Sequence, residues 1–174
     1  MEKNHLQVLQ GFRILLKAMA PYVAGELMAE YGDDWWEEAV LDILYDDQKR
    51  DLPLSGEQNT LVESLDIARC LLLFDLHWRE VFRKKLSIDH RTWAKELVST
   101  RNKLAHLGSN DFSANDTWRA LDTMSRLCEQ IDPEGAEEIR VLLRTSRYGS
   151  ANGSTTMIEG IVAPNAIAKA KKDG

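Results

Sequence analysis

The sequence predicts an all-α protein, an up-and-down bundle of four to five main helices followed by a flexible C-terminal tail. Apolar residues recur at intervals of three and four through the first 148 residues, the spacing of amphipathic helices that face a core. The same stretch lacks alternating apolar and polar runs bounded by turn residues, so no strand is predicted. Because apolar residues form 44% of the chain, one domain over residues 1–148 can bury a core.

The first two helices are predicted from an apolar stripe and a cap. The stripe consists of Leu9, Phe12, Leu16, Met19 and Val23. Pro21 lies inside this stripe and is expected to kink or restart the helix, because it lacks a backbone donor and clashes with the preceding turn. Asp33 or Asp34 can cap a short second helix that runs through Ile43. The polar residues 48–58 then form a connection.

A long third helix and a fourth helix follow. The apolar residues of the long helix are Leu61, Leu65, Ala68, Leu72, Leu76, Trp78 and Phe82. Ser87 or Asp89 can cap the next helix, which is expected to end near Gly108, a residue suited to a helix C-terminus. The residues predicted to turn inward on that helix are Trp93, Leu97 and Leu104.

Two more helices complete the predicted bundle. Ser113 or Asn115 can start one of them, and Asp132 followed by Pro133 can start the other, which runs to about Arg147. Their apolar residues are Trp118, Leu121, Met124, Cys128 and Ile131, then Ile139, Leu142 and Leu143. The composition of residues 149–174 changes to that of a linker, so this segment is expected to be a flexible tail or the lead-in to a further domain.

Composition argues against several classes of function. The net charge of −6 provides no global basic field, so an RNA partner would need a local patch such as residues 83–85, Lys95 and residues 101–103. Those charges also fit an ordinary solvated surface. Cys70 and Cys128 lie in helical apolar patterns and are expected to be buried thiols. Without a metal-binding motif, signal peptide or membrane span, we expect a cytoplasmic protein with no metal or cofactor.

Residues 101–106, Arg-Asn-Lys-Leu-Ala-His, are the segment most suited to chemistry. Asn102 and His106 are four residues apart and share a face of the predicted helix, opposite its apolar stripe. Ser99 and Lys95 extend this polar stripe, whereas Arg101 lies nearer the apolar edge. We therefore single out Lys95, Ser99 and Lys103 as candidate RNA-binding residues beside the motif.

Metal-free RNA cleavage requires two proton transfers and a cation at the phosphate. His106 can transfer protons, and Arg101 can hold a phosphate in a bidentate manner. Asn102 can orient His106 or donate to a phosphate oxygen. Histidine, arginine and asparagine also occur on helices for stability alone, and one histidine does not easily act as both acid and base. A symmetric dimer would bring two such helices together.

The segment 101–106 matches the RNxxxH form of the Rx4-6H motif of the HEPN superfamily. Residues 72–86, with His77-Trp78-Arg79-Glu80-Val81-Phe82, then Trp93 and His106-Leu107-Gly108, resemble one HEPN subfamily. That subfamily takes its name from a nuclear messenger-RNA quality-control endonuclease. The resemblance covers about residues 3–147.

The resemblance implies a metal-independent endoribonuclease that acts as a homodimer, with two motifs facing each other across a cleft. Arg101, Asn102 and His106 are the catalytic positions that it implies. Bacterial relatives often occur beside or fused to ATPases in anti-phage loci, which implies an ATPase or antitoxin partner. No tyrosine follows His106, so toxins regulated by nucleotide transfer to that tyrosine are a poor guide.

Many HEPN domains bind or dimerise without detectable cleavage, so the alternative is a catalytically inactive dimerisation module of a larger multidomain protein. A nucleotide-binding regulator is a weaker third possibility. Some HEPN sites are completed from the preceding helix, where the candidates are Glu63, Asp66 and Arg69. His77 is expected to be packed and His90 solvated, and most of the tryptophans are expected to lie in the core.

Overall fold

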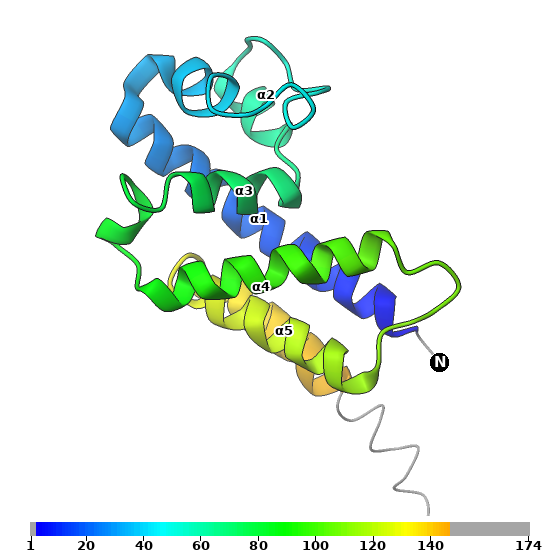
Figure 1. The fold of residues 1–174 in the computed structure, drawn as a ribbon. Coiled ribbons are helices and arrows are strands. Elements are labelled where there is room, and N and C mark those ends of the chain that lie inside the picture. The colour runs from blue at the N-terminus through cyan, green and yellow to red at the C-terminus, as the bar shows by residue number, and fades with distance from the viewer. Residues whose placement is uncertain (1–2, 147–174) are drawn as a thin grey trace, which may run out of the picture.

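The computed structural model describes residues 3–146 and confirms the predicted all-α bundle, since these residues form helices and turns and no strand. The main helices in this range are α1 (Asn4–Tyr31), α3 (Ile67–Leu76), α4 (Ile88–Ala105), α5 (Ala114–Glu129) and a last helix over residues 133–146. Figure 1 shows α1 running along the whole bundle, with α4 crossing it and α5 beside α4. The tail predicted for residues 149–174 lies outside the described range.

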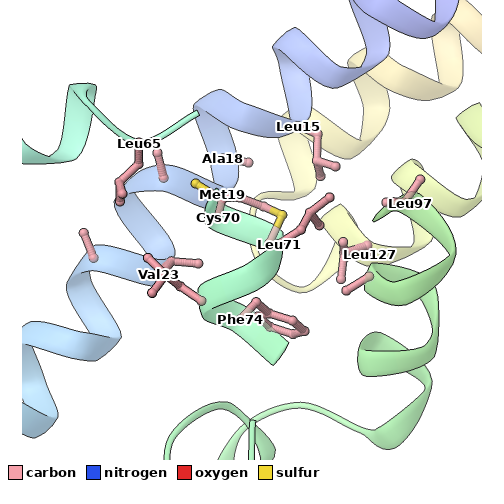
Figure 2. Close-up of a cluster of buried hydrophobic side chains, with 14 of the residues drawn as sticks. Leu15, Ala18, Met19, Val23, Leu65, Cys70, Leu71, Phe74, Leu97 and Leu127 are labelled. Carbon is pink, nitrogen blue, oxygen red and sulfur yellow. The ribbon is translucent and has the colours of Figure 1, made fainter. Parts of the chain in front are cut away.

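The core forms where α1 contacts α3 and α5, and where α4 contacts both of those helices. In Figure 2, Met19 and Val23 of α1 lie beside Leu71 and Phe74 of α3, and all four side chains are fully buried. Leu97 of α4 closes the same cluster and is also fully buried. Each main helix therefore contributes a stripe to one continuous core.

Helix α1 passes through Pro21 as one helix, so the expected restart at this residue is wrong. Pro21 is exposed, and so is Lys17, whose carbonyl loses its usual partner four residues later. Water can hydrogen-bond to that carbonyl on the solvent side of the helix, while buried residues on the opposite side hold the helix to its neighbours. The helix ends at Gly32, whose φ of 68° is left-handed and whose N–H donates to the Met28 carbonyl.

The short second helix is present but is not a regular, side-chain-capped α-helix. A 3₁₀ turn, η1 (Gly32–Asp34), leads into a π-helix, η2 (Trp36–Leu41), and neither has a side-chain cap. The Trp36 indole N–H donates to the Pro53 carbonyl at 2.8 Å. That bond ties the following connection to the core, because the Trp36 side chain is itself buried.

The expected long helix through residues 61–82 is broken into three pieces, so this prediction is also wrong. The pieces are α2 (Gln58–Glu63), α3, and after a turn the 3₁₀ segment η3 (Phe82–Lys84). The first break arises because Asp66 caps α3: its Oδ1 accepts the Arg69 N–H at 2.9 Å. The Ser64 hydroxyl donates to the Leu61 carbonyl at 2.6 Å, which satisfies the end of α2.

Two buried histidines lie at helix ends. His77 is packed, as predicted: it is buried at the end of α3, and its Nε2 donates to the Ala39 carbonyl at 2.7 Å. His90 is predicted to be solvated but is buried in the first turn of α4, where its ring packs edge-on against Trp93 and its Nδ1 accepts the Ser87 N–H at 3.2 Å. Burial lowers the pKa of both imidazoles.

The two cysteines are buried free thiols, as expected. Burial raises the pKa of both Cys70 and Cys128 to about 12, so neither has the character of a reactive thiolate. Among residues 3–146, none of the helices combines the length and apolar character needed to cross a bilayer.

The contact between α1 and α5 predicts opposite effects for two glycines of α1. A Cβ at Gly11 would lie 2.7 Å from both Leu121 Cδ2 and Met124 Sδ, whereas a Cβ at Gly25 would meet no atom within 4 Å. We expect Gly11→Ala to lower the free energy of unfolding by about 1–3 kcal/mol through overpacking. The matched Gly25→Ala should raise it by up to about 1 kcal/mol through helix propensity. Urea unfolding measures both, and equal effects would contradict this packing.

The buried histidines predict that stability falls in mild acid. Because the folded-state pKa values of His77 and His90 are lowered, unfolded chains bind more protons once the pH drops below about 6.5. The free energy of unfolding should therefore decline below that pH and level off below the folded-state pKa values. His77→Gln can keep a donor for the Ala39 carbonyl, and it should reduce this decline. An unchanged slope between pH 7 and pH 5 in that variant would contradict the assignment.

Candidate functional site

All six predicted site residues lie on α4 or at its C-terminal end. Ala94 and Leu97 face the core and fix the rotation of this helix against α3 and α5. The exposed side of α4 consequently carries Lys95, Ser99, Asn102, Lys103 and His106, while Arg101 is half-buried.

Arg101 lies in a hollow between α3 and α4, which we call the α3–α4 hollow. Its volume is about 460 Å³, and its polar lining includes Arg101, Asn102, Lys95 and Asp75. The rest of the lining is mostly apolar and comes from both helices. This side of α4 therefore combines a guanidinium with an apolar surface.

His106 lies in a second hollow, of about 450 Å³, which we call the His106 hollow. It is lined by Asn102, Lys103, His106, Leu107, Asn110 and Asp111. The chain leaves the helix here, because His106 is the C-cap of α4 and its backbone N–H reaches the carbonyls of Asn102 and Lys103 at 3.2 Å. The imidazole is thus presented at a helix end and is exposed to solvent.

Asn102 borders both hollows, whereas Arg101 and His106 line different ones. On a regular helix, positions 101 and 106 are separated by about 140° around the axis. One chain therefore presents the guanidinium and the imidazole on two sides of Asn102, and does not bring them into one hollow.

Two of the candidate lysines, Lys95 and Lys103, have acidic partners that the sequence does not indicate. Asp116, near the start of α5, accepts from Lys103 Nζ at 2.7 Å, and this hydrogen bond and charge lower the pKa of Asp116. Lys103 also lies over the Phe112 ring, with Nζ 5.0 Å from the ring centroid. Asp75 Oδ1 lies 3.8 Å from Lys95 Nζ. Such long-range pairs follow from helix packing and have no signature in the local sequence.

The family model described as Swt1-like HEPN matches residues 10–132. The chain belongs to the HEPN family of Swt1-like domains. No curated protein and no solved structure matches it. The match spans the helices α3, α4 and α5, and it includes all six candidate site residues.

In this HEPN domain, Asp111 joins the loop after the motif to the beginning of α1. Its carboxylate accepts the backbone N–H of Asn4 at 2.9 Å and of His5 at 2.7 Å, as well as that of Phe112 at 2.8 Å. Desolvation raises the pKa of Asp111, but these hydrogen bonds outweigh it and the net pKa is lowered. Asp111 also lines the His106 hollow. Asp111 therefore anchors the loop that lines the His106 hollow.

The residues proposed to complete the site from the preceding helix have other roles or positions. Asp66 and Arg69 contact each other, and Arg69 Nε donates to the Gln48 carbonyl at 3.0 Å, which holds the connection before α2 against α3. Glu63 is exposed at the end of α2. None of the three lines either hollow.

No cluster of three or more His, Cys, Asp or Glu side chains within residues 3–146 could hold a metal ion.

The anchor predicts a local effect of removing Asp111. We expect Asp111→Ala to speed amide hydrogen exchange of Asn4, His5 and residues 107–113, because three backbone donors lose their acceptor. Asp47→Ala, at an exposed carboxylate, is the control and should leave exchange in these segments unchanged. Equal exchange in the two variants would show that Asp111 does not hold the loop.

Proposed function

We propose that this chain is a metal-independent endoribonuclease of the HEPN type, with a composite site at a homodimer interface. The observation that carries the proposal is the position of Asn102 between the hollow of Arg101 and the hollow of His106. A phosphate at Asn102 would have a cation on one side and a proton-transfer group on the other.

The proposed reaction uses the ribose 2′-hydroxyl as nucleophile. The 2′-oxygen forms a bond to phosphorus while the bond from phosphorus to the 5′-oxygen breaks. A base takes the proton from the 2′-hydroxyl, and an acid gives a proton to the leaving 5′-oxygen. His106 serves in proton transfer, Arg101 neutralises the phosphate through its planar fork, and Asn102 donates to a phosphate oxygen. Lys95, Ser99 and Lys103 are proposed to contact the RNA.

A second copy of the chain supplies what one copy lacks. A single imidazole does not easily act as base and acid in one step, and two-fold symmetry would place a second His106 at the same site. The exposed apolar side chains Leu76 of α3 and Val98 of α4 lie on helices that line the α3–α4 hollow, and 46% and 38% of their surfaces are accessible. Burying them against a second copy would remove apolar surface from water.

The second candidate function is a HEPN interaction module without catalysis. Two electrostatic observations favour it. The carboxylates of Asp116 and Asp75 lie next to Lys103 and Lys95 and weaken the local positive field. The chain also carries a net charge of −6. Under this second proposal, residues 1–148 form the interaction domain, and residues 149–174 lead to another domain of a larger protein.

We also propose a cellular location, a biological role and a partner for the nuclease. We infer a cytoplasmic enzyme of phage defence that is controlled by an ATPase or antitoxin partner. This setting rests on the resemblance to bacterial HEPN proteins, and the cleavage chemistry proposed above does not depend on it.

Cleavage of RNA in EDTA tests the assigned residues. The wild-type chain should cut single-stranded and transfer RNA, and His106→Ala should lower the rate by about 10²–10⁴-fold, the usual contribution of proton transfer. Arg101→Ala should also lower it strongly, through loss of phosphate stabilisation. Arg126→Ala, at an exposed arginine of α5, is the matched control and should remain active. Undiminished cleavage by His106→Ala and Arg101→Ala would overturn the assignment.

The composite site predicts that the active species is a dimer. Light scattering at the concentrations used for cleavage should give twice the chain mass. Val98→Asp, which places a charge on the proposed interface, should shift the protein to monomer and reduce cleavage in parallel. Ile88→Asp is the control on a different exposed apolar residue of α4. Cleavage by a strict monomer would contradict a site shared between two copies.

A further inference from the structure

The α3–α4 hollow has the lining of a small-molecule binding site. Its apolar lining consists of Ala68, Leu71, Leu72 and Val98. Polar side chains, among them Asp75, Lys95 and Asn102, complete it. Its volume of about 460 Å³ lies within the range of small-molecule sites, which typically combine apolar walls with a few polar groups.

The hydrogen-bonding groups of Asp75 and Lys95 stand side by side in this hollow. Arg91 Nε contacts Asp75 Oδ1 at 2.8 Å, and Lys95 Nζ lies 3.8 Å from the same oxygen. Within residues 3–146, neither hydrogen bonds nor ion pairs are found for Asp75 Oδ2. The hollow therefore offers an ammonium donor next to a carboxylate that retains acceptor capacity.

Among the four RNA bases, guanine matches this arrangement. Its Watson–Crick edge presents the O6 acceptor beside two adjacent donors, N1–H and N2–H, so Lys95 can donate to O6 while Asp75 accepts from both donors. Adenine and cytosine place a ring acceptor next to their amino group, and uracil has one donor between two acceptors. Each of those bases would set an acceptor against the carboxylate. Proteins read single-stranded RNA bases by such edge contacts.

We propose that the α3–α4 hollow is a guanine-binding subsite for the nucleotide next to the cleaved phosphate. The inference deepens the proposed nuclease function and rests on it for the position of the phosphate. Arg101 and Asn102 line this same hollow, and Asn102 also borders the hollow of His106. A guanine in the α3–α4 hollow would therefore lie beside Arg101 and Asn102, the residues proposed to bind the phosphate.

The test separates base recognition from cleavage by using the full chain with His106→Ala. Fluorescence anisotropy measures its binding to hexauridylate and to hexauridylate with one central guanosine or adenosine. We expect the guanosine oligonucleotide to bind about tenfold or more tightly than the other two, the discrimination typical of a bidentate base contact. Adding Asp75→Asn should abolish this preference. Asp122→Asn, whose carboxylate also pairs with an arginine at 2.9 Å, should preserve it.

A second variant guards against misfolding of Asp75→Asn. Val98 lines the hollow and is partly exposed, so Val98→Trp can fill the hollow while the side chains of Asp75 and Arg91 are kept. It should remove the guanosine preference as well, and light scattering on the same sample reports the oligomeric state. If the guanosine preference persists in this variant, whatever its oligomeric state, guanine does not occupy the hollow and the proposal is overturned.

Different results would overturn the guanine subsite and the nuclease function. Cleavage without any base preference, equal in wild type and Asp75→Asn, would overturn the guanine subsite and leave the nuclease intact. Guanosine preference in a chain that never cleaves RNA would support the subsite and overturn the nuclease. Equal binding of all three oligonucleotides by the His106→Ala chain would overturn the subsite directly.

Discussion

The burial of one face of α1 along its 28 residues is the constraint on which the rest of the structure depends. Both α3 and α5 pack on this helix, and α4 closes the bundle against those two. The contact with α5 is close because Gly11 has no Cβ to hold Leu121 and Met124 away. A shift of α1 would therefore move the supports of α4, the helix that carries the candidate site.

The arrangement of α4 separates a structural side from a chemical side. Ala94 and Leu97 are buried, and this burial forces the polar stripe that ends at His106 toward solvent. The motif ends where the helix ends, so the imidazole lies at a junction between helix and loop. Asp111 holds that loop to the first turn of α1 through backbone donors. The position of the imidazole is therefore coupled to the packing of the N-terminal helix.

Charge around the site is balanced by carboxylates from other helices. Asp75 of α3 faces Lys95 and Arg91, and Asp116 of α5 holds Lys103. Pairs this exposed contribute little to stability. Their consequence is local: they weaken the positive electrostatic field beside α4.

The sequence by itself determined the helical class, most of the core residues, and the motif that marks the chain as a HEPN protein. These follow from local rules, because apolar spacing and motif spacing are properties of neighbouring residues. Local rules failed at Pro21, where packing on one side and water on the other keep α1 continuous, and at Asp66, where a cap divides the expected long helix. They also failed at His90, which lies in the first turn of α4 and is buried there with its ring against Trp93.

Only the tertiary structure decided which groups surround the motif. Helix packing brings Asp75 of α3 and Asp116 of α5 to α4, and Asp111 in the loop after α4 is held by the start of α1. The tertiary structure also places Arg101 and His106 in different hollows, with Asn102 bordering both. No spacing along the chain encodes these contacts, because they depend on how each helix is rotated when its apolar face is buried.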